Sequence, residues 1–99
     1  MPEVELRVRN PSGLHARPAA TFVKAAASFA AGIRVANLDR EPQRAVSAKS
    51  VIGVLGIGVS SGHRIRLVAE GDDADAAIAT LSKLVEAGLG ETVDAADGA

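Results

Sequence analysis

The sequence predicts a small α+β fold in which a four-stranded antiparallel sheet carries its helices on one face. Apolar and polar residues alternate over several short segments, a pattern that indicates half-buried strands. Two longer segments repeat apolar residues every three or four positions, a pattern that indicates amphipathic helices. Because each strand has one apolar face and each helix one apolar stripe, helices on a single face of the sheet bury both.

The predicted elements follow one another in the order β-α-β-β-(short α)-β-α. Alternation places the strands at about 4–8, 33–35, 43–47 and 64–69. Pro18 suits the first turn of the first long helix, which we expect Gly32 to end. The last helix opens after 71–73 and continues to about Val85. Ser50 is expected to cap a brief helical turn before the fourth strand.

The chain has the length of one domain. We expect that domain to span 1–90 and a flexible acidic tail to occupy 91–99. Hydrophobic residues make up 47% of the sequence, which favours a folded globule over disorder. With no secretory signal and no long apolar run, we expect a cytoplasmic protein that does not insert into membranes.

The composition excludes several classes of function. A formal net charge of −1 gives no general attraction to nucleic acid or anionic membranes. The two aromatic residues, Phe22 and Phe29, are too few to form a stacking platform for single-stranded nucleic acid. The absence of cysteine excludes disulfides, thiolate metal sites and a cysteine nucleophile. We therefore expect no cofactor and no metal.

The segment with the clearest chemical meaning places His15 between a glycine turn and the start of a helix. Unpaired backbone N–H groups and the helix dipole make such a junction an anion-binding site. Arg17 can add charge-assisted hydrogen bonds to phosphate oxygens. A neutral imidazole is nucleophilic near pH 7, so His15 suits a covalent phosphoryl intermediate. The residues alone leave open a second interpretation, in which His15 is an ordinary surface or capping residue.

Two motifs resemble the HPr family, the histidine-containing phosphocarriers of the bacterial phosphoenolpyruvate–sugar phosphotransferase system. The stretch Gly13-Leu14-His15-Ala16-Arg17-Pro18-Ala19 resembles the active-site signature of that family, and 48–55 resembles the segment around its regulatory serine. The similarity extends over about 4–89, nearly the whole chain. It implies an open-faced β-sandwich of four antiparallel strands and three helices, in agreement with the elements predicted above.

The resemblance also implies roles for individual residues near the histidine. His15 matches the phosphoacceptor, which carries the group as a pros-phosphohistidine, and Arg17 matches the arginine that stabilises the phosphoryl group. Ser12 and Ala16 match phosphate-binding positions beside that histidine. Ser50 matches a serine that a dedicated kinase phosphorylates in some bacteria to regulate carbon catabolism. The positions that match a partner-docking face are Lys24, Lys49, Val51, Ile52 and Leu55.

The partners that the resemblance implies are Enzyme I as phosphoryl donor and sugar-specific EIIA domains as acceptors. A serine kinase and phosphatase acting on Ser50 are further partners of this kind. Such a protein is a carrier and no enzyme, because it turns over no small molecule of its own. We expect a monomer, since no broad apolar patch is evident beyond the docking segment.

Three other functions fit parts of the sequence. The chain resembles paralogous carriers as well, such as those of the dihydroxyacetone kinase or nitrogen-related phosphotransferase branches, and the longer connection at 38–43 leaves that choice open. A regulatory module acting through Ser50 alone is disfavoured by the presence of His15 and Arg17. A hydrolase of the acylphosphatase type is disfavoured because no glycine-rich loop contains an arginine.

Overall fold

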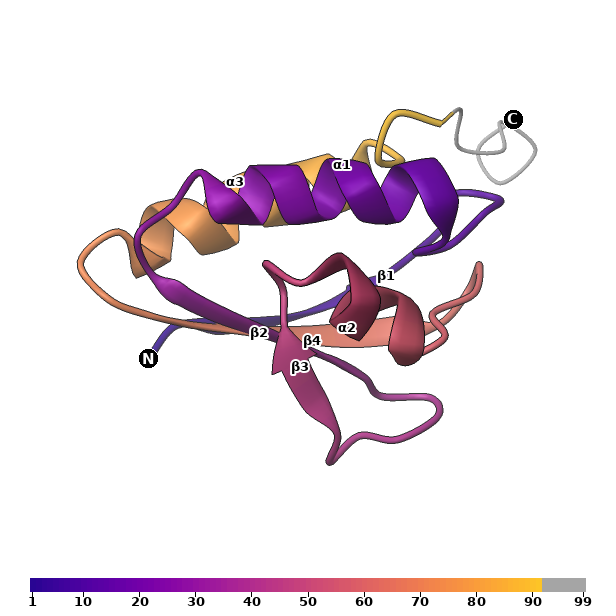
Figure 1. Cartoon of the computed structure of the whole chain (residues 1–99), viewed down its shortest axis with the longest axis horizontal. Helices are drawn as coiled ribbons and strands as arrows, with labels where there is room; N and C mark the ends of the chain where they lie inside the picture. Colours follow the sequence, from indigo (N-terminus) through magenta and orange to yellow (C-terminus); the bar gives the residue numbers. More distant parts are fainter. Residues whose placement is uncertain (92–99) are drawn as a thin grey trace.

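The computed structural model describes residues 1–91 as seven elements in the predicted order (Figure 1). The four strands are β1 (Glu3–Arg7), β2 (Gly32–Asn37), β3 (Ala45–Ser47) and β4 (Arg64–Glu70). The three helices are α1 (Ala16–Ala27), α2 (Val51–Gly56) and α3 (Ala74–Glu86). The predicted tail lies outside the described residues from position 92 onward. No helix within residues 1–91 is long and apolar enough to cross a membrane.

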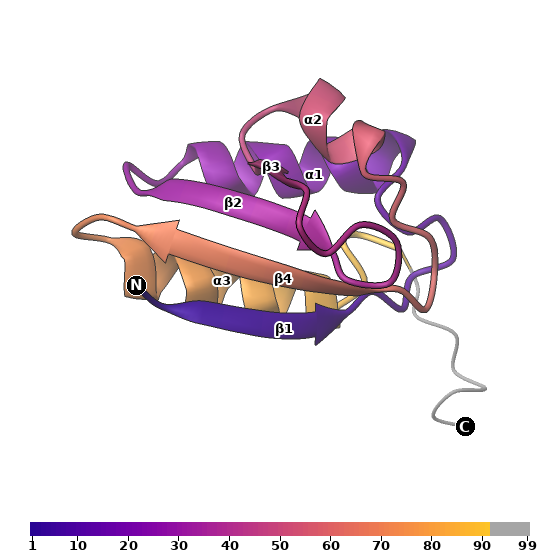
Figure 2. The same cartoon turned by 90° about the horizontal axis from the view of Figure 1, so that it is seen from below.

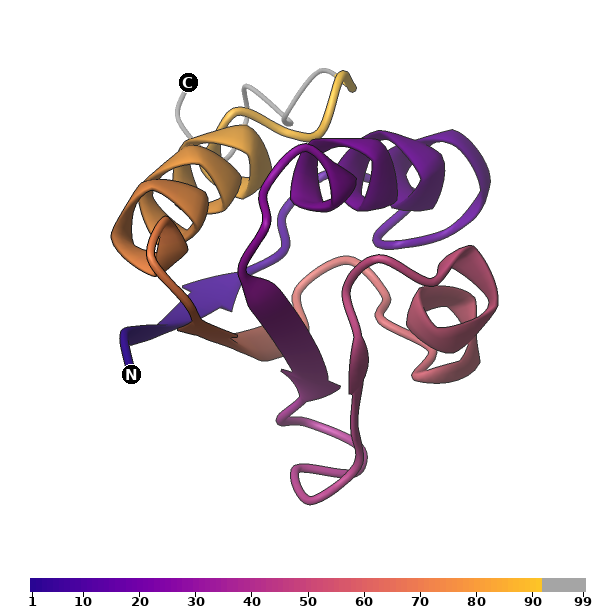
Figure 3. The same cartoon turned by 60° about the vertical axis from the view of Figure 1, so that its left-hand side comes forward.

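The four strands form one antiparallel sheet in the order β1-β4-β2-β3. Long helices α1 and α3 cover one face, and Figure 2 shows the sheet from the other side, with α3 behind β4 and β1. Figure 3 shows the short helix α2 beside α1, at the β3 side of the sheet. This arrangement confirms the predicted fold class, an open-faced sandwich with one helical layer.

The core fills the space between the sheet and its helices. Leu67 and Ile65 project from β4, Phe22 from α1 and Leu81 from α3, and none of these side chains is exposed to solvent. The predicted alternation explains which side chains of β4 enter the core, because Arg64 and every second residue after it face away from the helices. Leu14 is buried in the same core. It immediately precedes the candidate nucleophile, so the core reaches the functional segment directly.

The first helix ends earlier than predicted. Gly32 was expected to stop it, but α1 ends at Ala27 and Gly32 begins β2. The Ser28 hydroxyl donates to the Ala25 carbonyl at 2.6 Å and closes the last turn. The carboxylate of Asp73, before α3, then accepts the backbone N–H groups of Ala30 and Ala31, each at 2.8 Å. These two contacts hold 28–31 in a non-helical turn, and they lower the pKa of Asp73 below its ordinary value.

The long connection between β2 and β3 is fixed to β4. Asp39 accepts the Arg64 backbone N–H at 2.6 Å and forms an ion pair with its guanidinium at 3.1 Å. Arg66 donates to the Pro42 carbonyl at 3.2 Å. The hydrogen bonds from Arg64 lower the pKa of Asp39. The third strand begins at Ala45, two residues later than predicted, because the connection turns through Glu41 and Arg44 first.

The fold predicts that replacing two different leucines by alanine lowers the free energy of unfolding by very different amounts. Leu67→Ala opens a cavity in the centre of the sheet and is expected to lower the free energy of unfolding by about 2–5 kcal/mol. Leu55→Ala removes a side chain that is 39% exposed and is expected to change it by less than about 1 kcal/mol. Urea denaturation of both variants measures the difference. Equal losses would contradict the assignment of Leu67 to the core.

Candidate functional site

His15 is the residue that precedes the first turn of α1. Its backbone is extended, with φ −120° and ψ 155°, and its side chain is exposed. Ala16 follows with φ 46°, in the left-handed region that L-residues seldom adopt. This sharp turn takes the chain from a buried leucine into the helix within two residues. The imidazole of His15 therefore stands at the helix start and faces solvent.

The first turn of α1 has two free backbone donors. The N–H groups of Ala16 and Arg17 have no acceptor among residues 1–91, and Pro18 has no N–H to offer. The Ala19 N–H reaches back to the His15 carbonyl at 3.5 Å, a long and weak contact. Two donors and the positive end of the helix dipole thus lie next to the exposed imidazole. An anion held there needs no further rearrangement of the backbone.

The loop before His15 is fixed by close backbone contacts. Leu14 donates its N–H to the Val59 carbonyl at 2.9 Å. Gly13 has φ 59°, and a Cβ at this position would overlap the Val59 carbonyl oxygen and the Ser60 backbone. Asn10 donates from its side chain to the Gly13 carbonyl at 2.9 Å. The glycine is therefore required both for its conformation and for the close approach of the two loops.

Glu91 lies beside the same loop, a contact that sequence reasoning missed. Its carboxylate accepts the Ser12 N–H at 3.0 Å, the Ser12 hydroxyl at 2.8 Å and the Asn10 side-chain amide at 2.9 Å. Hydrogen bonds from the Asn10 and Ser12 side chains, then from the Ser12 backbone, lower the pKa of Glu91, and the nearby charge of Arg17 adds to the effect. The sequence placed this residue in a flexible tail, and no local signal marks it as a ligand of a loop 79 residues away.

Ser12 was predicted to bind phosphate. In this structure both of its donors are bonded to the Glu91 carboxylate. Arg17 is exposed at the second position of α1, next to His15. Of the four residues assigned to phosphate chemistry, His15, Ala16 and Arg17 thus lie together with free donors. Ser12 instead supports the loop that leads to them.

The predicted docking residues lie mainly on α2. Val51, Ile52 and Leu55 are 41%, 84% and 39% exposed, and they form most of the large exposed apolar surface of residues 1–91. Ser50 caps the helix as predicted, accepting the Gly53 N–H at 3.0 Å. Figure 1 places α2 beside the N-terminal half of α1, so the helix that carries these apolar residues lies near the start of α1.

The two lysines of the predicted docking face differ in their surroundings. Lys24 is exposed on α1. Lys49 is half-buried, and its ammonium donates to the Phe29 carbonyl at 2.7 Å. Lys49 therefore also holds the turn that ends α1, a structural role that its position in the sequence did not indicate.

His63 has surroundings that the sequence did not predict. Its side chain is half-buried, and its Nδ1 accepts the Ser60 N–H at 3.0 Å. The same nitrogen lies 3.1 Å from the side-chain nitrogen of Asn37. These contacts shape the loop on which Gly13 and Leu14 rest. The second histidine of the chain is thus a structural residue, and His15 is the exposed one.

Comparison with known proteins agrees with this geometry. The family model described as the PTS HPr component phosphorylation site matches residues 2–87. The chain belongs to the HPr family, the phosphocarriers of the phosphotransferase system. It is 41% identical to the phosphocarrier protein HPr of Streptomyces coelicolor, over 92% of this chain and 95% of that protein. Its structure matches HPr-C-His from Thermoanaerobacter tengcongensis with a TM-score of 0.85 and 44% identity, covering 92% and 98% of the two chains.

The HPr fold also occurs within longer relatives. The chain is 49% identical to the multiphosphoryl transfer protein of Haemophilus influenzae over 89% of its own length. It spans only 17% of that relative. Membership of the HPr family therefore identifies the type of domain. It does not identify the assembly in which the domain works.

The contact between Glu91 and the loop gives a direct prediction. Glu91→Gln replaces a charged acceptor of three hydrogen bonds by a weaker neutral one. We expect the backbone N–H of Ser12 to exchange with solvent several-fold faster, as measured by amide hydrogen exchange. Glu86→Gln, at an exposed carboxylate near the end of α3, is the matched control and is expected to leave that rate unchanged. An unchanged rate in Glu91→Gln would show that the contact does not order the loop.

Proposed function

We propose that this HPr-family chain accepts a phosphoryl group on His15 from Enzyme I and passes it to EIIA domains of the sugar phosphotransferase system. The observation that carries the proposal is the exposed imidazole beside two free backbone donors, those of Ala16 and Arg17. The family match over residues 2–87 includes this segment. The protein is then a carrier in the cytoplasm that turns over no small molecule.

The proposed transfer is a substitution at phosphorus. The pros nitrogen of His15, Nδ1, uses its lone pair to form the new N–P bond, while the bond from phosphorus to the donor protein breaks and its electron pair leaves with the donor. The other ring nitrogen keeps the proton, so one neutral imidazole becomes a phosphoimidazole. The Ala16 and Arg17 N–H groups, the helix dipole and the Arg17 guanidinium all stabilise the negative oxygens. In the second transfer, the N–P bond breaks in the same manner.

A carrier needs a site that stabilises the phosphoryl oxygens by hydrogen bonds and partial charge alone. The two N–H groups and the dipole lower the energy of the bound group, yet they form no bond that must later be cleaved. The site is exposed, so donor and acceptor proteins reach the same nitrogen in turn. Glu91 supports this arrangement because hydrogen bonds from Asn10 and Ser12 stabilise its ionised carboxylate beside Arg17.

The apolar surface of α2 is proposed to dock both partners. Ile52 is 84% exposed and lies next to Val51, so a partner recess can bury both side chains. Lys24 and Arg17, exposed on α1, supply positive charge that steers acidic partners. Lys49 contributes to this face mainly through the hydrogen bond from its ammonium group to the Phe29 carbonyl. The docking contact then brings a partner's active site close to the start of α1.

Ser50 is proposed as a regulatory phosphorylation site for a serine kinase and phosphatase. Its hydroxyl caps α2 and is half-buried, immediately before the exposed Val51 and Ile52. A phosphate there would add about −1.5 to −2 charges beside the apolar surface, and acidic partners would be repelled. The effect on docking is local, because the new charge stands at the edge of the surface that the partner must cover.

Loss of the nucleophile should abolish phosphorylation. Wild-type protein incubated with phosphoenolpyruvate, Mg²⁺ and a bacterial Enzyme I is expected to gain about 80 Da, and the gain should be acid-labile. His15→Ala is expected to show no gain, while His63→Gln, at the structural histidine, retains it. Intact mass with and without acid treatment provides the measurement. A gain that persists in His15→Ala, or wild-type protein that gains nothing, would overturn the assignment.

The docking surface can be tested without touching the chemistry. Ile52→Glu places a charge in the centre of the proposed contact and is expected to slow phosphoryl transfer from Enzyme I by about tenfold or more. Thr80→Glu adds the same charge on the exposed side of α3 and should leave the rate unchanged. Rates are followed by intact mass at limiting Enzyme I. Equal rates for both variants would show that α2 does not dock the donor.

A further inference from the structure

The outer edge of β1 is a row of unpaired backbone groups. The strand order leaves β1 at the margin of the sheet, and no strand of residues 1–91 pairs with its outer side (Figure 2). Val8 exchanges backbone hydrogen bonds with the β4 side, donating to His63 and accepting from Gly62. Because inward and outward groups alternate in an antiparallel strand, the N–H and C=O groups of Glu3, Glu5 and Arg7 point away from β4.

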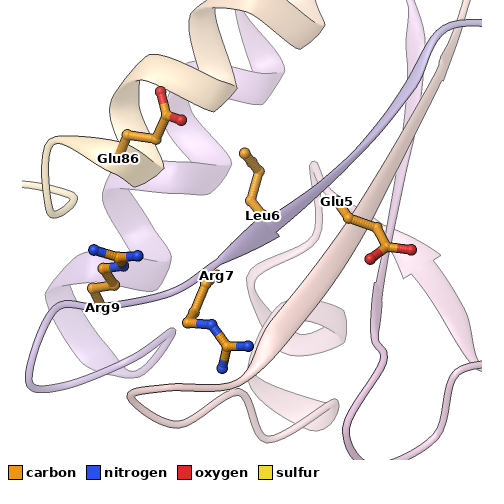
Figure 4. Close-up of a pocket in the computed structure, with 5 residues that line it drawn as sticks. All are labelled: Glu5, Leu6, Arg7, Arg9 and Glu86. Atoms are coloured by element: carbon orange, nitrogen blue, oxygen red, sulfur yellow. The ribbon is translucent and has the colours of Figure 1, made fainter.

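A cleft of about 360 Å³ runs along this edge, lined by β1 and its continuation on one side and by the end of α3 on the other (Figure 4). Its lining residues are Glu5, Leu6, Arg7, Arg9 and Glu86. Figure 4 shows Leu6 on the α3 side of the strand and Glu5 on the opposite side. The space beside the strand is therefore open, and charged side chains border it.

The charges along β1 are self-complementary. Two acids, Glu3 and Glu5, precede Leu6, and two arginines, Arg7 and Arg9, follow it at the same spacing. All four are exposed. An antiparallel strand of the same sequence therefore presents an arginine wherever this strand presents an acid. This symmetry is a property of the β1 segment alone and does not depend on the phosphocarrier site.

The sequence alone predicts a monomer, but we propose that two copies of this chain pair their β1 strands antiparallel, about a two-fold axis that passes between the two Leu6 residues. Glu5 of each copy then lies opposite Arg7 of the other, and Glu3 lies opposite Arg9. The outward backbone groups of these residues supply the hydrogen bonds of the new ladder. The result is one continuous sheet of two identical halves, with both helical layers on the same face.

Neighbouring registers are less favourable for a reason that the charges make plain. Only residues whose backbone groups point outward can form the hydrogen-bonded pairs. The alternative registers that keep such residues opposite one another place the two-fold axis at a neighbouring residue of β1. An axis at Glu5 places Glu5 opposite its own copy, and an axis at Arg7 does the same for Arg7. Like charges directly opposite each other destabilise an antiparallel pair. The axis at Leu6 is the register that matches every acid with an arginine.

The helices leave room for this pairing. Helix α3 contacts both β1 and β4, so it lies over the space between them. With strands about 4.8 Å apart, the two α3 axes in the pair would be about 10 Å apart, an ordinary distance for packed helices. Helix α2 and β3 are at the opposite margin of the sheet. The pair therefore leaves the docking surface and His15 accessible, and it forms whether or not the chain carries phosphate.

The experiment uses two single charge reversals that are each self-repelling and together complementary. Glu5→Arg gives arginine at positions 5 and 7, and Arg7→Glu gives glutamate at both. Sedimentation velocity of the full-length wild type, from micromolar to millimolar concentration, is expected to show a reversible monomer–dimer equilibrium. Each variant alone is expected to dimerise at least about tenfold more weakly than wild type.

Mixing the two variants restores the complementary pairs, so an equimolar mixture is expected to dimerise about as well as wild type. The double variant, with both charges exchanged, is expected to recover in the same way. Circular dichroism confirms that each variant is folded, since both side chains are exposed. A monomeric wild type at every concentration would overturn the proposal. Dimers that ignore the charges at positions 5 and 7, or mixtures that do not associate, would overturn it equally, because they place the contact elsewhere.

Discussion

The functional end of the molecule depends on the burial of Leu14 immediately before the exposed His15. Leu14 lies in the core with no exposed surface, and its N–H is bonded to the Val59 carbonyl. The backbone must then reverse from a buried position into the first turn of α1, and the left-handed conformation of Ala16 accomplishes this reversal. An imidazole attached to such a fixed junction has little freedom to leave the helix start. The core therefore sets the position of the nucleophile.

The hydrogen-bond donors around this junction fall into two groups, those bonded to Glu91 and those without an acceptor in the described part of the chain. Glu91 takes the donors of Ser12 and one from Asn10, and these bonds stabilise the loop. The N–H groups of Ala16 and Arg17 have no acceptor among residues 1–91, and Pro18 removes the donor that would otherwise compete with them. The arrangement keeps a carboxylate close to the site and leaves the two donors beside His15 unbonded within that range. One acid thus orders the site, and its ionised form is stabilised by hydrogen bonds and by the charge of Arg17.

The sequence predicted the fold order and the segment around His15, because both depend on local patterns. Alternation identified β1 and β4, and the glycine turn identified the helix start that carries His15. Contacts between distant residues account for what it missed. The end of α1 is set by Asp73, more than 40 residues further along the chain. The role of Ser12 is set by Glu91, and that of Lys49 by the Phe29 carbonyl. No local pattern encodes these three partners.

The account rests on the claim that the Ala16 and Arg17 N–H groups, rather than those of Ser12, receive the phosphoryl oxygens. Two-dimensional ¹H–¹⁵N NMR of the protein before and after phosphorylation tests this claim most directly. The account predicts large downfield shifts of the Ala16 and Arg17 amide protons, with the Ser12 amide nearly unchanged because Glu91 still holds it. A large shift of the Ser12 amide, with little change at Ala16 and Arg17, would contradict the account.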